Sequence, residues 1–254
     1  FMEFKVTTAS KPHKTSNDDI ARHEGNIFWL MDGATQLVAP AHGLDACWHV
    51  GRLSHELAKL ARAEPAASLA DIAKAAIEIV GREFQETTGL DETEPQDLRP
   101  FSTLILCRHL PEAQKLEYLL LCDSTLLVVQ NGQARVVDSD PRLDNLHALD
   151  ECYTVLAAGK GFDSPEYKAA LRRTYHIGQG KLNNSGHPQA WYAVAQDASV
   201  IDQALSGMID FNAGVDVLLM SDGFTRAVDT LGLYKDWDAL AVALKTIGPD
   251  KIID

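Results

Sequence analysis

Aspartates stand directly after three apolar segments that lie far apart in this 254-residue sequence. The segments and their aspartates are 27–31 before Asp32, 116–122 before Asp123, and 215–221 before Asp222. A glycine follows the first and the last of these aspartates, and an earlier acidic pair, Asp18 and Asp19, completes the set. Bulky apolar runs that end in Asp-Gly are typical of buried strands that stop at a turn. The sequence therefore predicts carboxylates at the ends of three strands.

Carboxylates gathered in one place need something to neutralise them. Two unit charges about 4 Å apart repel one another by about 4 kcal/mol at an effective dielectric constant near 20. Shared protons would relieve this repulsion, as they do in carboxylate dyads. A set of several acidic groups with only oxygen ligands suits a hard divalent cation such as Mg²⁺ or Mn²⁺ better. We therefore expect a divalent-cation site.

The composition narrows the class of protein. The formal net charge of −13 argues against a general binder of nucleic acid or anionic membranes, because phosphate groups require a basic face. No apolar run approaches the roughly 20 residues needed to cross a bilayer, and the first residues do not resemble a signal peptide. The four cysteines form no C-x-x-C pair. We expect them to be reduced core residues of a cytoplasmic protein.

Hydrophobic periodicity predicts the elements that must position the aspartates. Apolar residues recur at helical spacing in two long stretches, 46–60 and 69–84. Shorter helices are expected at 165–175, 198–207 and 236–247, with a turn or short helix at 224–228. Amphipathic helices of this kind need the face of a sheet to cover their apolar sides.

Strands are expected at 4–6, 27–31, 101–107, 116–122 and 215–220. The strongest local signal is Asn131-Gly132 between the apolar runs 126–130 and 134–137, which predicts a hairpin with a type I′ turn. Antiparallel strands thus pass through the middle of the chain. Two groups of strands with helices around them predict packed layers in the order α-β-β-α.

The order of these motifs resembles that of the metal-dependent serine/threonine protein phosphatases of the type-2C family. The acidic pair, then strands ending in Asp-Gly, Asp-Ser and Ser-Asp-Gly, follow one another as in that family, across residues 17–223. The resemblance implies a single domain over residues 1–254 with an α+β fold, a four-layer α-β-β-α sandwich of two mainly antiparallel sheets flanked by helices. It also implies a monomer that hydrolyses phosphoserine and phosphothreonine on a phosphorylated protein substrate.

The resemblance also implies a set of metal ligands. Asp32 would bridge two Mn²⁺ or Mg²⁺ ions, the backbone carbonyl of Gly33 would reach one of them, and Asp222 would support the other. Asp123 matches a carboxylate that can bind a weaker third ion. Two ions roughly 3.5–4 Å apart acidify a shared water and screen the phosphoryl oxygens during in-line attack, so no protein nucleophile is required.

Three further residues receive roles from the same resemblance. Asp18 and Asp19 would hold metal-bound waters by hydrogen bonds. Lys14 stands where an arginine commonly grips the substrate phosphate. A lysine keeps the charge and loses the planar bidentate fork. The other interpretation of Lys14 is an ordinary solvated loop residue.

Four positions depart from the family pattern. They are Lys14 for an arginine, Ala34 for a histidine that acts as an acid in eukaryotic members, Cys122 for a glycine, and Thr125 for an arginine. These departures favour an alternative, a catalytically weak or inactive regulatory or binding module with the same fold. A second alternative is a carboxylate-rich metal hydrolase of unrelated topology. Retention of every acidic position through Asp222 favours an active enzyme.

The last residues match the family poorly. Members usually end in a strand that opens with an acidic pair, whose aspartate is a further ligand of the ion held by Asp222. Residues 248–254 do not resemble such a strand. Either Asp250 or Asp254 substitutes for that ligand, or the natural protein continues beyond this sequence; we expect the second, and so a domain that lacks its last strand.

Overall fold

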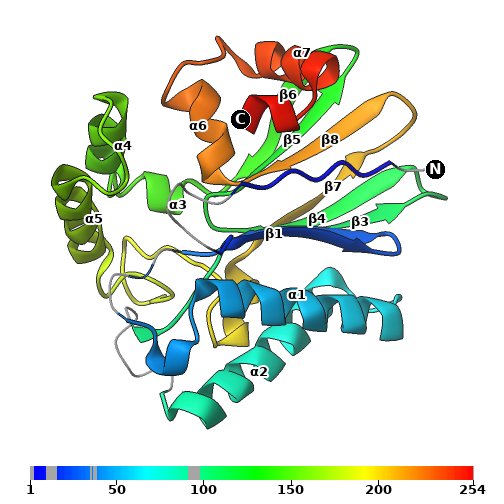
Figure 1. Ribbon diagram of the computed structural model, residues 1–254. Coiled ribbons are helices and arrows are strands. Elements are labelled where there is room, and N and C mark those ends of the chain that lie inside the picture. Colours follow the sequence, from blue (N-terminus) through cyan, green and yellow to red (C-terminus); the bar gives the residue numbers. More distant parts are fainter. Residues whose placement is uncertain (1–2, 10–15, 35, 37–38, 91–97, 254) are drawn as a thin grey trace.

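The computed structural model describes residues 3–9, 16–34, 36, 39–90 and 98–253. Two antiparallel sheets pack face to face, and helices cover both outer faces (Figure 1). The predicted four-layer α-β-β-α architecture is therefore confirmed. None of the described helices combines the length and the apolarity needed to span a membrane.

The first sheet has five strands in the order β1-β2-β3-β4-β7. Their bounds are Asp19–Glu24, Ile27–Asp32, Leu104–Leu110, Lys115–Leu121 and Leu205–Asp210. Both faces of its central strands are buried. Trp29 and Met31 point to the helices, whereas Phe28 on the same strand points to the second sheet. This alternation follows from the period-two geometry of a strand and places Asp32, four residues after Phe28, on the same side of β2 as Phe28.

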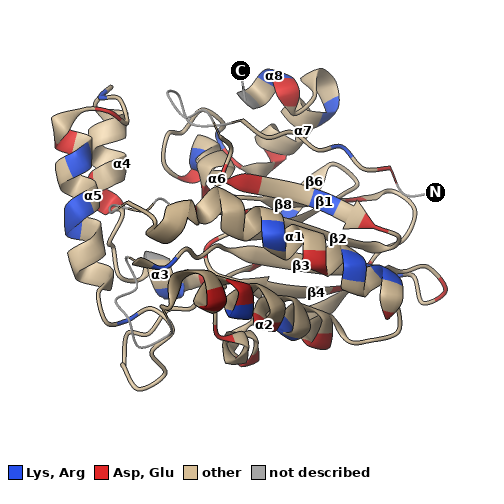
Figure 2. Cartoon of the chain, turned by 60° about the horizontal axis from the view of Figure 1, so that its bottom comes forward, with Lys and Arg blue, Asp and Glu red and all other residues tan. Residues whose placement is uncertain are grey.

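Helices α1 (Ala46–Ala63) and α2 (Leu69–Thr88) cover the outer face of the first sheet, as their periodicity predicted. Asp45 caps α1 by accepting from the Trp48 N–H, and Ser68 caps α2 by accepting from the Asp71 N–H. Both apolar stripes are buried against the sheet. The opposite, solvent-facing sides carry charged residues of both signs (Figure 2).

The second sheet has three strands in the order β6-β5-β8, with bounds Gln133–Ser139, Thr125–Gln130 and Val215–Met220. The predicted hairpin is present, because Asn131 and Gly132 adopt the left-handed φ values of 53° and 79° that a type I′ turn requires. Helices α6 (Asp222–Asp229), α7 (Trp237–Ile247) and α8 (Asp250–Ile253) lie over its outer face (Figure 1).

Residues 140–178 form a helical unit beside the ends of the sheets. Helix α3 (Pro141–Asp144) leads to α4 (Asp150–Ala157) and α5 (Pro165–Gly178), and the last two pack on each other (Figure 1). The sequence predicted α5 and gave no placement for the two helices before it. We refer to α4 and α5 together as the α4–α5 hairpin.

Three predictions about local structure were wrong. Residues 3–9 form no strand. The Phe4 ring instead stacks on the His23 ring, with centroids 4.2 Å apart, and contacts the Phe28 ring edge-on. The helix expected at 198–207 is a 3-10 helix, Ala198–Gln203, followed directly by β7. The strand expected at 101–107 is present but starts three residues later, at Leu104, and Ser102 makes only isolated bridges to Gly33 and Val194.

Candidate functional site

Strand pairing brings the first two aspartates together. Asp19 opens β1, Asp32 closes β2, and the antiparallel register places the two residues directly opposite each other. Side chains on directly paired strand residues have Cβ atoms about 5 Å apart. The register therefore makes these carboxylates neighbours, although 13 positions separate them in the sequence.

The second sheet contributes the other two aspartates. Thr125 at the start of β5 pairs with Met220 at the end of β8, so the residues just outside this pair lie at one edge of the sheet. Asp123 comes two residues before Thr125, and Asp222 comes two residues after Met220. Asp222 also begins α6, where the helix dipole favours a negative charge.

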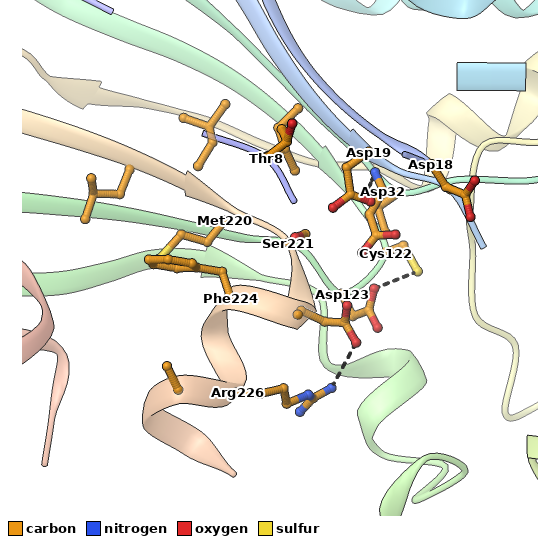
Figure 3. Close-up of a pocket in the computed structure, with 18 of the residues that line it drawn as sticks. Thr8, Asp18, Asp19, Asp32, Cys122, Asp123, Met220, Ser221, Phe224 and Arg226 are labelled. Carbon is orange, nitrogen blue, oxygen red and sulfur yellow. Dashed lines mark hydrogen bonds and ion pairs between the residues drawn. The ribbon is translucent and has the colours of Figure 1, made fainter. Parts of the chain in front are cut away.

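All four aspartates, together with Asp18, line one cleft of 2490 Å³. Figure 3 shows Asp19, Asp32 and Asp123 directed into the same space, whereas the Asp18 carboxylate points away from them. The structure thus gathers Asp19, Asp32, Asp123 and Asp222, and the role predicted for the Asp18 side chain stays a prediction.

The charge at this end of the sandwich acts most strongly on Asp32. Burial raises the pKa of Asp32 well above its usual value, and the carboxylates of Asp222, Asp19 and Asp123 raise it further, with hydrogen bonding to Asp222 also contributing. Burial disfavours the ionised form, and nearby negative charges do the same. Asp32 therefore lies at the electrostatic centre of the site.

Gly33 allows the two strand ends to approach each other. Its N–H donates to the Asp18 carbonyl at 3.0 Å, and a Cβ at this position would lie only 2.8 Å from that oxygen and 3.0 Å from the Ala46 side chain. No larger residue fits without moving backbone. The glycine is thus required by packing, independently of the metal contact predicted for its carbonyl.

Two hydroxyl groups that no sequence pattern singled out hold the strand ends in place. The Thr103 Oγ1 accepts from the Asp32 N–H at 3.0 Å and from the Ser124 Oγ at 2.8 Å. Thr103 and Ser124 are both buried, so these bonds form in a low-dielectric setting where they are strong. The signal available in the sequence was a hydroxyl residue next to each buried strand.

Asp222 has partners that no sequence pattern predicted. Its Oδ2 accepts from the Tyr153 hydroxyl at 3.3 Å and lies 3.6 Å from the Arg226 Nη2. Tyr153 belongs to α4, whereas Arg226 is on the same helix as Asp222. The α4–α5 hairpin therefore reaches the site through this carboxylate.

The donor set suits hard divalent cations. The gathered side chains offer oxygen atoms alone, which is the ligand type that Mg²⁺ and Mn²⁺ prefer. Within the described residues, no three Asp, Glu, His or Cys side chains close around a common point, so the ligands are gathered without forming a finished coordination shell. Lys14, the predicted phosphate-binding residue, lies outside the described residues.

Asp250, an alternative metal ligand in the sequence analysis, lies in α8 and accepts from the Thr7 hydroxyl at 2.5 Å. Asp254, the other alternative, lies outside the described residues.

Comparison with known proteins finds no matching family model and no matching curated protein. Solved structures do match. The serine/threonine phosphatase of S. agalactiae is 18% identical, with a TM-score of 0.59 over 99% of this chain and 94% of that one. The Mycobacterium tuberculosis serine/threonine phosphatase PstP/Ppp is 17% identical, with a TM-score of 0.57 over 96% and 85%. The catalytic domain of PstP in complex with two manganese ions is 16% identical, with a TM-score of 0.52 over 95% and 91%.

The fold is that of the PPM serine/threonine phosphatases. The family resemblance seen in the sequence is thereby confirmed at the level of the fold, and at these identities the likeness establishes the fold alone. The aspartates described above lie at one end of this PPM sandwich.

Cys122 departs from the PPM pattern in a way that the backbone explains. It adopts a left-handed φ of 71°, a conformation that a glycine reaches without strain and a side chain with a Cβ does not. Its buried Sγ donates to Asp123 Oδ1 at 3.4 Å, so the strained residue directly precedes a site carboxylate.

We expect Asp32→Asn to stabilise the metal-free protein at neutral pH. Because the folded-state pKa of Asp32 is raised, the folded protein binds this proton more readily than the unfolded chain does. Stability therefore falls as pH rises from the unfolded pKa of about 3.9 through the folded pKa, and the variant escapes this loss. Thermal unfolding in chelator should show a higher Tm for the variant at pH 7.5 and a vanishing difference near pH 4. The control is Asp202→Asn, at an exposed aspartate that pairs with Lys74, and it should not raise the Tm at pH 7.5. A lower Tm for Asp32→Asn at pH 7.5 would contradict the assignment.

We expect Cys122→Gly to be more stable than Cys122→Ala by about 1 kcal/mol, because both variants lose the sulfur and the glycine alone relieves the left-handed backbone. Chemical denaturation of both variants measures this difference. Cys107 is the matched control, since it is equally buried in β3 with ordinary strand geometry, and there alanine should be the more stable replacement. The same order at both positions would show that Cys122 carries no backbone strain.

Proposed function

We propose that this protein is a metal-dependent phosphatase that hydrolyses phosphoserine and phosphothreonine on proteins. The observation that carries the proposal is the convergence of Asp19, Asp32, Asp123 and Asp222 on one half-buried cleft at one end of a PPM fold. The solved structure of the PstP catalytic domain, which has the same fold, is of a complex with two manganese ions. A cleft lined with carboxylates suits a cation-dependent reaction on a phosphate ester.

Two of these aspartates, Asp32 and Asp222, are the proposed side-chain ligands of two Mn²⁺ or Mg²⁺ ions. Asp32 would contact both, Gly33 would contribute its carbonyl oxygen, and Asp222 would complete the pair, with Asp123 holding a weaker third ion. The bound ions would lower the pKa of a shared water and neutralise the phosphoryl oxygens. The chain itself would keep these ligands fixed through the Thr103 and Ser124 hydrogen bonds.

Other residues of the chain would orient the attacking water and the substrate. Asp19, directed into the site, can accept a hydrogen bond from a water beside Asp32. Asp18 is proposed to do the same, and Lys14 to bind the substrate phosphate. Ala34 carries no proton donor, so solvent would protonate the leaving group.

An inactive or weakly active regulatory module is the second candidate. Two observations favour it. Asp222 is already paired with Tyr153 and Arg226, and the carboxylates form no closed coordination shell within the described residues. Such a module would keep the PPM fold and bind a phosphorylated partner without hydrolysing it. Turnover measurements separate the two candidates.

The cellular setting follows from charge and cysteine chemistry. The described cysteines are thiols that form no disulfide, which suits a reducing compartment, and we propose the cytoplasm. The net charge of −13 favours a phosphoprotein bound through metal ions over nucleic acid or an anionic membrane. We propose that the protein acts as a monomer.

We expect hydrolysis of an aryl phosphate and of phosphoserine or phosphothreonine peptides to require Mn²⁺ or Mg²⁺. Asp32→Asn and Asp222→Asn should each lower turnover by at least about 100-fold, because loss of a charged ligand exceeds the 10–100-fold typical of outer-shell changes. Asp202→Asn is the control and should keep its activity. Equal turnover in excess chelator, or near-parental activity of folded Asp32→Asn, would place the chemistry elsewhere.

Asp123→Ala should distinguish the proposed weaker third ion from the two proposed ions at Asp32 and Asp222. We expect the variant to bind two ions and keep its fold while its turnover or metal dependence changes. Calorimetric titration with Mn²⁺ counts the sites. Loss of every site in this variant would contradict the role proposed for Asp123.

A further inference from the structure

The charge of Asp222 is already partly neutralised by the protein. Arg226 follows one helical turn later on α6, and its Nη2 lies 3.6 Å from Asp222 Oδ2. The Tyr153 hydroxyl donates to the same oxygen at 3.3 Å. Arg226 lines the same cleft as Asp123 and Asp222 (Figure 3). A fixed cation thus stands next to a proposed metal ligand.

Tyr153 and Arg226 also hold each other. The guanidinium carbon of Arg226 lies 3.8 Å from the centre of the Tyr153 ring, and Arg226 Nη2 donates to the Tyr153 hydroxyl. The Arg226 side chain is only 15% exposed. Cation–π attraction and charge-assisted hydrogen bonds are stronger when water is excluded. The three side chains therefore form one connected unit.

This unit ties the α4–α5 hairpin to the site. Tyr153 lies on α4, which packs on α5, whereas Asp222 and Arg226 lie on α6. Tyr167 on α5 is close enough that Asp222 contributes, after burial and Cys152, to raising its pKa to about 12. The hairpin thus meets the body of the protein at the same carboxylate that the proposed function assigns to a divalent ion.

We propose that Tyr153 and Arg226 form a latch that competes with the divalent cation for Asp222. The inference rests on the proposed function. A guanidinium beside Asp222 repels a divalent ion bound there, and a rotation of the carboxylate that turns Oδ2 toward the metal lengthens its contacts with Tyr153 and Arg226. Occupancy of the metal site and docking of the hairpin are therefore linked with negative coupling, and the coupling is reciprocal.

Release of the latch would still leave the Arg226 guanidinium with acceptors nearby. Arg226 Nη1 lies 3.8 Å from Asp229 Oδ1 and 3.5 Å from the Thr230 hydroxyl, both on the following turn of the chain. These groups can take over the guanidinium when Asp222 leaves it. The latch thus has two arrangements built from residues that are already in contact, as a two-state element requires.

The test is calorimetric titration of Mn²⁺ into the whole protein, without substrate. We expect Arg226→Met to bind Mn²⁺ about tenfold more tightly, because removal of one nearby positive charge changes binding by an amount of that order. Tyr153→Phe should tighten binding less, since it removes the hydroxyl contact and keeps the ring. Arg226→Lys keeps the charge and should remain close to the parent. Arg173→Met is the matched control, because Arg173 pairs with Glu151 on the exposed side of the hairpin.

Hydrogen exchange of residues 150–157 gives the reciprocal measurement. Saturating Mn²⁺ should speed exchange in the parent protein, and it should have a smaller effect in Arg226→Met, where only the Tyr153 hydroxyl still contacts Asp222. Unchanged or weaker Mn²⁺ affinity in folded Arg226→Met, or exchange in the parent that Mn²⁺ leaves unchanged, overturns the latch while the phosphatase proposal stands. If neither protein binds Mn²⁺ at all, the proposed metal site fails and the latch fails with it.

Discussion

Mutual repulsion of carboxylates at one end of the sandwich is the constraint on which the site depends. Two such charges about 4 Å apart oppose each other by about 4 kcal/mol at an effective dielectric constant near 20, a large share of the 5–15 kcal/mol by which a domain is stable. Asp32 takes the largest part of this strain because it is buried among the others. The fold must hold these groups together until a cation or a proton neutralises them.

The site carboxylates are held together by backbone that cannot shift locally. β2 is paired on both sides and buried on both faces, so a slip of one residue would turn Trp29 and Met31 away from the helices and Phe28 out of the layer between the sheets. Gly33 packs its backbone against Asp18, and Thr103 locks the Asp32 N–H. The register of the sheets thus transmits the stability of two hydrophobic layers to the position of the carboxylates.

The features that were predictable from the sequence are those determined by residues close together in the chain. An apolar run that ends in Asp-Gly, an Asn-Gly hairpin and two amphipathic stretches depend on neighbours within a few residues, and all of them are present. Thr103, Tyr153 and Arg226 were missed because their importance arises from contacts across 71, 69 and 4 positions with carboxylates whose placement only the folded sheets define. Adjacent strand residues point to opposite sides, so the pair Asp18 and Asp19 also needed the register of β1 before one of them could be directed into the site.

β7 was missed for a different physical reason. Its central Gly207 weakens the strand pattern, yet a Cβ there would lie 2.7 Å from the Tyr118 hydroxyl, so the ring of the neighbouring strand needs the glycine. Tyr118 in turn donates to Asp138 of β6 in the second sheet. A residue that lowers local strand propensity therefore makes room for a contact between the two sheets. The α4–α5 hairpin likewise depends on contacts between distant parts of the chain. Tyr153 has an ordinary helical context in the sequence, and its role arises only from its contact with the Asp222 carboxylate. The excess negative charge that suits the site to divalent ions also attracts a guanidinium. Arg226 and a metal ion would therefore both neutralise the same carboxylates.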